Sequence, residues 1–163
     1  MKIPSVSGKN LSFFVCGLLW GVVLAYIIGG IFLKKFIILE YKSNFTVNDT
    51  ADKIAKNAVY TGRWLAKVSP CALPQPSDNT DVRIVTLCNA EIAKSIVDDH
   101  GSRRLSSIIP CQIAIYRKPD GSTALSRLNF ALIGSLCGGN SAAMSSLAVK
   151  EQEEILRDVL VNP

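Results

Sequence analysis

The chain has little of what enzymes usually show in sequence. Of its 163 residues only one is histidine, His100, and none of its five cysteines forms a C-x-x-C pair. With one histidine, in the polar stretch "DDHGSRR", there is no evident Ser–His–Asp or Cys–His set, and we expect His100 to be a solvated residue near a helix C-terminus. Without a C-x-x-C pair, the sequence lacks the strongest signatures of a zinc site and of a thioredoxin-like redox site.

Phosphate-binding loops and separated carboxylate pairs are also missing. The glycine-rich stretch "GSLCGGN" (134–140) lacks the lysine of a P-loop and does not match G-x-G-x-x-G, so we interpret it as a flexible turn before a helix. General acid–base chemistry has no support from the pattern of acids. Those in the two acid-rich stretches lie in runs that we expect at the surface: Asp98, Asp99, Glu151, Glu153 and Glu154. The sequence therefore predicts no catalytic residue and no cofactor.

The folded part of the chain has no excess of positive charge. The net charge is +5, but Lys2, Lys9, Lys34 and Lys35 all flank one apolar segment, and residues 36–163 hold 14 Lys+Arg against 13 Asp+Glu. A nucleic-acid-binding domain concentrates basic residues on itself. We therefore predict no nucleic-acid partner, and we interpret the flanking lysines as contacts to lipid headgroups.

What the sequence does contain is a run of 23 uncharged residues at 11–33, after a short N-terminal tail at 1–10. As a helix this run is about 34 Å long at about 1.5 Å per residue, which suits a hydrocarbon core of roughly 30 Å. A signal peptide has a shorter apolar region and a small-residue cleavage site, and a core helix has a polar face. We therefore predict a retained transmembrane helix, anchoring the chain in the lipid bilayer.

Small residues recur at every fourth position of this helix, at Gly17, Gly21, Ala25 and Gly29. Helices in lipid associate by close backbone packing across small residues, although glycine is common in membrane helices in general. We interpret this face as a packing surface for other transmembrane helices, in a homodimer or in a larger membrane complex. The lysines on the two sides of the helix are nearly balanced, so charge alone does not set its orientation.

Residues 36–163 are predicted to form one compact α+β domain, with helices packed on a mainly antiparallel sheet. Strands are expected at 36–43, 64–73 and 82–88, and a hairpin around "KPDG" at 108–130. Helices are expected from the capping residues at 48–50 to Gly62, from Asn89 through 99, and from 141 to 161. The stretch 74–81 is expected to be a loop.

Two cysteines lie where a thiol or ligand site is conceivable. Cys88 ends a strand before Asn89, at a helix start that would lower a thiol pKa, and Cys111 follows Pro110 at the mouth of the next strand. If the two strands are neighbours, the sulfurs come close together. A disulfide, a metal site and two independent buried thiols all remain open, and the metal is unknown.

The soluble part resembles a family of domains of unknown function, number 302 (DUF302). The resemblance rests on ordered motifs at Cys88–Asn89, Pro110–Cys111, Tyr116, Asp120–Gly121, Asn129 and Gly138–Gly139. It departs from the family at Ala90, where proline is usual, and at Gln112, where arginine is usual; if the family holds an anion with that arginine, this chain has lost it. The resemblance implies a compact α+β fold, often exported or membrane-anchored in bacteria, and it implies no reaction.

Together these patterns favour a single-pass, non-catalytic accessory or binding subunit of a bacterial membrane complex. The expected location is the cytoplasmic membrane, with the domain on the periplasmic side, as the resemblance suggests. The alternative is a membrane-tethered thiol-redox or metal-binding protein that uses Cys88 and Cys111.

Overall fold

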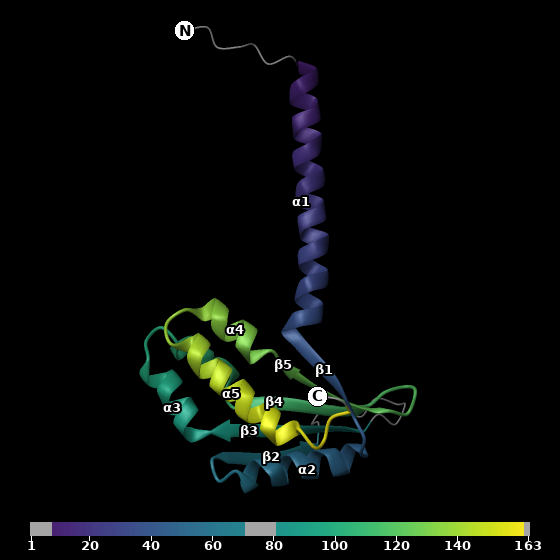
Figure 1. The fold of residues 1–163 in the computed structure, drawn as a ribbon. Helices are drawn as coiled ribbons and strands as arrows, with labels where there is room; N and C mark the ends of the chain where they lie inside the picture. The colour runs from purple at the N-terminus through teal and green to yellow at the C-terminus, as the bar shows by residue number, and fades with distance from the viewer. Residues whose placement is uncertain (1–7, 71–80, 162–163) are drawn as a thin grey trace. The chain divides into compact units, whose positions relative to one another are not determined.

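The computed structural model describes residues 8–70 and 81–161 and places them in eleven elements. The predicted loop at 74–81 lies, except for Asp81, outside the described residues. The elements are α1 (Gly8–Ile37), β1 (Ile38–Ser43), α2 (Val47–Tyr60), β2 (Trp64–Pro70), β3 (Val82–Asn89), α3 (Ala90–Asp98), the 3-10 helix η1 (Arg103–Ile108), β4 (Cys111–Arg117), β5 (Thr123–Leu128), α4 (Phe130–Cys137) and α5 (Ser141–Leu156) (Figure 1).

The five strands form one sheet in the order β1-β5-β4-β3-β2, and every neighbouring pair is antiparallel. This confirms the predicted fold class. The 108–130 hairpin is present as β4 and β5, joined through a turn in which Gly121 has a φ of +80°. Glycine adopts that conformation at little cost.

One face of the sheet carries the hydrophobic core. Side chains alternate between the two faces of each strand, and the helices α2, α3 and α5 pack on the face that holds Val85, Leu87, Ile113, Ile115 and Leu125. On the other face, Thr86, Ala114 and Ser126 are half-buried, and Gln112 is exposed. The sheet is therefore two-sided, with one packed face and one face that the described residues leave partly open.

Capping residues set the starts of the helices, though not always those expected. Asn89 caps α3 as predicted, accepting hydrogen bonds from the backbone N–H of Glu91 and Ile92. The cap of α2 is Thr46, whose hydroxyl accepts from the Asp49 N–H, and not a residue in 48–50. Both caps satisfy backbone donors that the first turn of a helix leaves without partners.

The helices differ from the prediction in three places. Helix α1 continues to Ile37, so the first strand begins two residues later than expected. The apolar stretch "FALIGSLC" forms α4, which the sequence analysis missed, together with the short η1. Helix α5 ends at Leu156 instead of Val161, after which Leu160 pairs with Ser43 of β1 in an isolated bridge.

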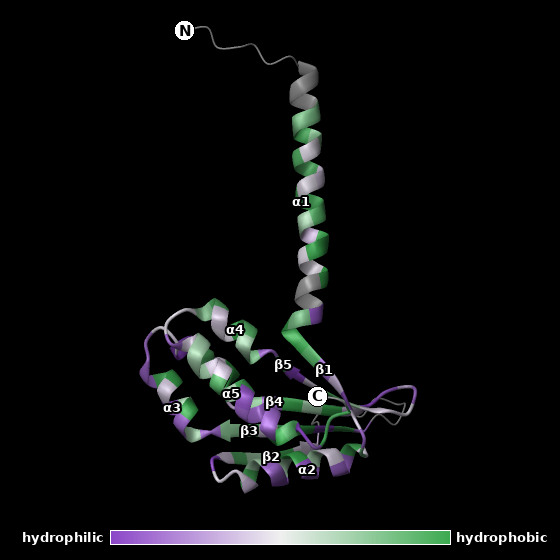
Figure 2. Cartoon of the chain, viewed as in Figure 1, coloured by the Kyte–Doolittle hydropathy of each residue, from purple (hydrophilic) through white to green (hydrophobic). Residues whose placement is uncertain are grey.

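The described residues divide into two compact units, Met1–Phe36 and Ile37–Pro163. In the first unit one helix is long and apolar enough to span a membrane, over Phe13–Ile37, with a mean hydropathy of 2.3 and none of its most apolar window buried. Figure 2 shows the hydrophobic residues that cover this helix. Trp20 and Tyr26 are 68% and 83% exposed, so their rings have no protein core around them.

Candidate functional site

An opening forms where β4 and β5 separate. The two strands pair from Ile113↔Arg127 to Arg117↔Thr123, but before Ile113 the partners differ. Cys111 and Gln112 pair only with β3, opposite Leu87 and Thr86, while Leu128 pairs only with Ile38 of β1. The separated strand ends border a cavity of about 450 Å³.

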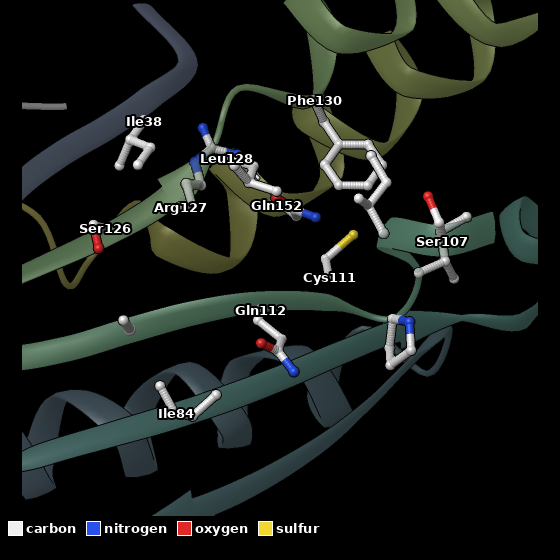
Figure 3. A pocket seen from close by; sticks show the side chains of 14 residues that line it. Ile38, Ile84, Ser107, Cys111, Gln112, Ser126, Arg127, Leu128, Phe130 and Gln152 are labelled. Atoms are coloured by element: carbon white, nitrogen blue, oxygen red, sulfur yellow. Dashed lines mark hydrogen bonds between the residues drawn. The ribbon is translucent and has the colours of Figure 1, made fainter. Parts of the chain in front are cut away.

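The cavity has apolar walls and a small number of polar groups (Figure 3). Its apolar lining comes from β1, β3, η1, β5 and α4: Ile38, Ile84, Ile108, Ile109, Leu128 and Phe130. The polar groups are contributed by Ser107, Cys111, Gln112, Ser126, Arg127 and Gln152, and none of the fourteen described lining residues is acidic. Apolar walls with a few convergent polar groups are typical of small-molecule sites.

Arg127 is the charged group of this site. It occupies a core-facing position of β5 and is only 5% exposed. Its Nη1 donates to Gln152 Oε1 at 2.9 Å, and Nη2 lies 3.6 Å from a carboxylate oxygen of Glu153, whose side chain is 62% exposed. Its Nε has no hydrogen-bond partner among the described residues. A buried cation with a free N–H is costly unless something accepts from it.

Gln152, on α5, is the second polar group without a full set of partners. The side chain is 2% exposed, its oxygen accepts from Arg127, and within the described part of the chain its Nε2 has no oxygen or nitrogen acceptor, only the weakly accepting Cys111 sulfur beside it. Figure 3 shows this nitrogen pointing toward the Cys111 sulfur. Two buried N–H donors, on Arg127 and Gln152, therefore lack an oxygen or nitrogen acceptor among the described residues at one cavity.

The Cys111 thiol is held in its neutral form. Burial raises its pKa to about 11, and the neighbouring Gln152 amide and Arg127 charge lower it by smaller amounts. At neutral pH the side chain is therefore a protonated, weakly donating thiol. Since the thiolate is the form that attacks electrophiles and binds metals, this environment suppresses both kinds of chemistry.

The predicted thiol or ligand site is brought together only in part. Cys111 and Pro110 line the cavity, while Cys88 lies on the neighbouring strand β3, one residue beyond Leu87, which faces Cys111 across the ladder. Both cysteines and Asn89 also line a second, much narrower cavity. Cys88 and Cys111 are free cysteines, as are Cys16 and Cys137. Among the described residues, no three His, Cys, Asp or Glu side chains gather as a metal site would require.

The prediction that Glu151 lies at the surface is wrong. It is buried, and its Oε2 accepts from Trp64 Nε1 at 2.7 Å and from Asn89 Nδ2 at 3.0 Å. Its Oε1 pairs with Arg63 at 2.9 Å. The carboxylate is thus fully used in joining α5 to β2 and to the start of α3. Glu153 and Glu154 are exposed, as predicted.

The predicted turn before the last helix is confirmed at Gly138 and Gly139, while residues 134–137 belong to α4. Gly138 and Gly139 have positive φ values and turn the chain from α4 into α5. At Gly139 an added Cβ would come within 2.9 Å of Asp99 Oδ2, so the backbone passes directly against this carboxylate. Asp99 in turn accepts from the Ser102 and Asn140 backbone N–H groups.

The predicted helix-packing face is open. An added Cβ at Gly17, Gly21 or Gly29 would meet nothing within 4 Å, and Ala25 is exposed. Within the described residues these positions therefore have room for a second backbone. Whether a helix occupies that room stays a prediction.

The domain is thus an α+β domain whose antiparallel sheet opens onto a buried arginine–glutamine pair. A solved structure described as the crystal structure of the uncharacterized conserved protein DUF302 from Bacillus stearothermophilus is similar to it. The TM-score is 0.63 with 13% identity, over 77% of this chain and 99% of that chain. At this identity the match establishes the fold, and it supports the resemblance drawn from the motifs. No family model and no curated protein matches the chain.

Proposed function

We propose that this protein is a single-pass, membrane-anchored, non-catalytic accessory or binding subunit of a bacterial membrane complex. The observation that carries the proposal is the 13–37 helix, which is long and apolar enough to cross a bilayer and has none of its most apolar window buried. Exposing that much apolar surface to water is strongly unfavourable, whereas lipid accepts it. The domain would lie on the periplasmic side.

The cavity supports the binding part of this proposal. It combines apolar walls with two buried donors that have no acceptors, while its described lining offers neither an acidic residue nor a histidine. Catalysis by proton transfer needs a group that titrates near the working pH. A pocket that attracts a ligand and holds no such group suits recognition better than turnover.

The alternative of a thiol-redox or metal-binding protein is less well supported. The raised pKa of Cys111 disfavours the reactive thiolate. Cys111 pairs with Leu87 across the ladder, and Cys88 is the next residue after Leu87. Because side chains alternate between the two faces of a strand, Cys88 and Cys111 point to opposite faces of the sheet. A disulfide between them would therefore need the backbone to move.

The anchor and its packing face are tested together in the full chain. Gly21→Leu with Ala25→Leu fills the small-residue face, and we expect it to release the protein from its complex in mild detergent, measured by native gel migration and light scattering. The matched control, Val23→Leu with Ile27→Leu, introduces the same two leucines elsewhere around the helix and should change nothing. All variants should stay in the membrane after alkaline carbonate washing.

Two results would contradict the proposal. If the doubly substituted chain migrates with its complex as the unaltered chain does, the small-residue face is not the packing surface. If the unaltered chain is recovered in the carbonate supernatant, residues 11–33 do not anchor it.

A further inference from the structure

We infer that the cavity between the separated ends of β4 and β5 is a binding site for a small organic carboxylate with an apolar body. Its carboxylate would accept hydrogen bonds from Arg127 and Gln152. The inference rests on the proposed binding function and adds the chemical class of the ligand.

Two buried donors line the same cavity without a strong acceptor. Among the described residues Arg127 Nε has no hydrogen-bond partner, and Gln152 Nε2 has only the weakly accepting Cys111 sulfur beside it. The neutral Cys111 thiol adds a weak donor beside the Gln152 amide. Leaving buried donors without a good acceptor is costly. A ligand that presents acceptors, and not donors, removes that cost.

The buried charge of Arg127 further restricts which class of ligand fits the cavity. The guanidinium of Arg127 is almost fully buried, and the one carboxylate paired with it in the described structure is that of Glu153, at 3.6 Å and largely in water. No described lining residue is acidic, so nothing inside the cavity neutralises the cation. An anion satisfies both the charge and the free Nε–H, whereas an uncharged amide or ester satisfies only the hydrogen bond.

The remaining surface favours an apolar body. Isoleucines from β1, β3 and η1, together with Leu128 and Phe130, form most of the wall, and the volume of about 450 Å³ suits a molecule of modest size. Inorganic phosphate or sulfate would leave this apolar surface hydrated. A monocarboxylate with a short hydrocarbon or aromatic tail matches both halves of the cavity.

The test uses the full chain in nanodiscs of zwitterionic phosphatidylcholine, which has no net charge, with empty nanodiscs to correct for partitioning of the probes. Hexanoate, hexanamide and inorganic phosphate are titrated separately. The NMR signals of the Arg127 Nε–H and the Gln152 side-chain amide report occupation of the cavity. We expect hexanoate to shift both signals and to bind at least about ten-fold more tightly than hexanamide or phosphate, since charge and tail each contribute.

Two variants and a control sharpen the test. Arg127→Lys keeps a cation but removes the Nε–H, and it should weaken hexanoate binding at least about ten-fold. Because a buried substitution can prevent folding, Gln112→Glu provides a second variant: Gln112 lines the cavity but is exposed. Its added negative charge should weaken hexanoate binding at least about ten-fold more than it changes hexanamide binding. Arg117→Lys, at the exposed far end of β4, should alter neither.

Each contrary result is distinct. If hexanamide and hexanoate bind equally well, or if Gln112→Glu weakens the binding of both equally, the ligand is not a carboxylate and the cavity binds uncharged molecules. If phosphate binds as tightly as hexanoate, the inference that the ligand has an apolar body is wrong. If no probe moves either signal, the inference is wrong as a whole, while membrane retention and complex release, measured separately, still decide the proposed function.

Discussion

Buried polar side chains at two neighbouring positions of α5, Glu151 and Gln152, show how much depends on single residues here. Glu151 faces Trp64 and Asn89, and the next residue, Gln152, faces Arg127. The first set is fully paired and holds elements together. The second is incompletely paired and lines a cavity. Of these adjacent side chains, Glu151 therefore holds elements together, and Gln152 belongs to the proposed binding site.

The structural role predicts a loss of stability on Glu151→Gln. The amide keeps one acceptor oxygen but turns a nitrogen donor toward groups that also donate, so a buried donor loses its acceptor. We expect the free energy of unfolding to fall by about 1–3 kcal/mol, measured by urea denaturation of the full chain in detergent. Glu154→Gln, at an exposed position of the same helix, should stay within about 0.5 kcal/mol. Equal effects would show that the network contributes nothing.

Cys111 should be the slowest cysteine of the domain to react. With a pKa raised to about 11, only about one part in a thousand is thiolate at pH 8, and burial restricts access further. Alkylation followed by mass spectrometry should label Cys88 and Cys137 before Cys111 in the native chain. In denaturant the difference should disappear. Rapid native labelling of Cys111 would instead support thiol chemistry at this site.

At the scale of elements, α4 and α5 form a helical hairpin in very close contact. An added Cβ on Gly134 would lie 2.1 Å from Ser145 Oγ and 2.8 Å from the Ser141 carbonyl oxygen. Only glycine allows the two backbones to approach this closely. Because Phe130 of α4 lines the cavity and Gln152 lies on α5, the hairpin also positions two walls of the site.

Gly134→Ala should therefore overpack this hairpin. We expect a loss of about 1–3 kcal/mol in the free energy of unfolding, measured by thermal or urea denaturation. Ser145→Gly in the same chain should recover part of the loss by removing the atoms that the new methyl group meets. Ser135→Ala, exposed on α4, is the control. A neutral Gly134→Ala would mean that the helices separate freely.

Elements with strong periodicity were predicted well, and those set by tertiary contacts were not. Asn89 marked the start of α3 and "KPDG" marked the hairpin, because caps and turns are local chemistry. Helix α4 was missed because its eight residues, of which only Ser135 is polar, carry no polar face from which to recognise a helix.

The site was half visible in the sequence. Cys111 and Pro110 were singled out, but Arg127 and Gln152 were not. Both had a usable signal: Arg127 continues the inward alternation of Thr123 and Leu125 in β5, and Gln152 stands four residues after the buried Ala148. Nothing local shows that β4 and β5 separate beyond Ile113, since that depends on pairing with β3 and β1.

At the scale of the whole domain, acid should weaken the fold partly through Asp99. Hydrogen bonds from the Ser102 hydroxyl and from the Asn140 and Ser102 backbone hold the pKa of Asp99 below its usual range. A lowered folded-state pKa stabilises the native state above the unfolded pKa of about 4, and this contribution is lost as the pH falls through the folded value.

Asp99→Asn should accordingly flatten the loss of stability below about pH 4, followed by urea denaturation across the acid range. Glu40 and Asp120 also have lowered pKa values, so some acid dependence should remain. An unchanged pH profile in Asp99→Asn would show that the carboxylate is equally free in the native and unfolded chains.

The pairing of the first strand with the last residues has a consequence for biosynthesis. Strand β1 directly follows the apolar helix, yet its ladder partner is β5, and its Lys42 carbonyl accepts from the Val161 N–H. When the ribosome has released β1, neither partner exists yet. Folding of such distant contacts is slow, so the newly made chain must hold an unpaired strand edge until β5 and residues 159–161 have been made. We therefore expect the proposed transmembrane helix to be inserted before the domain that follows it has closed.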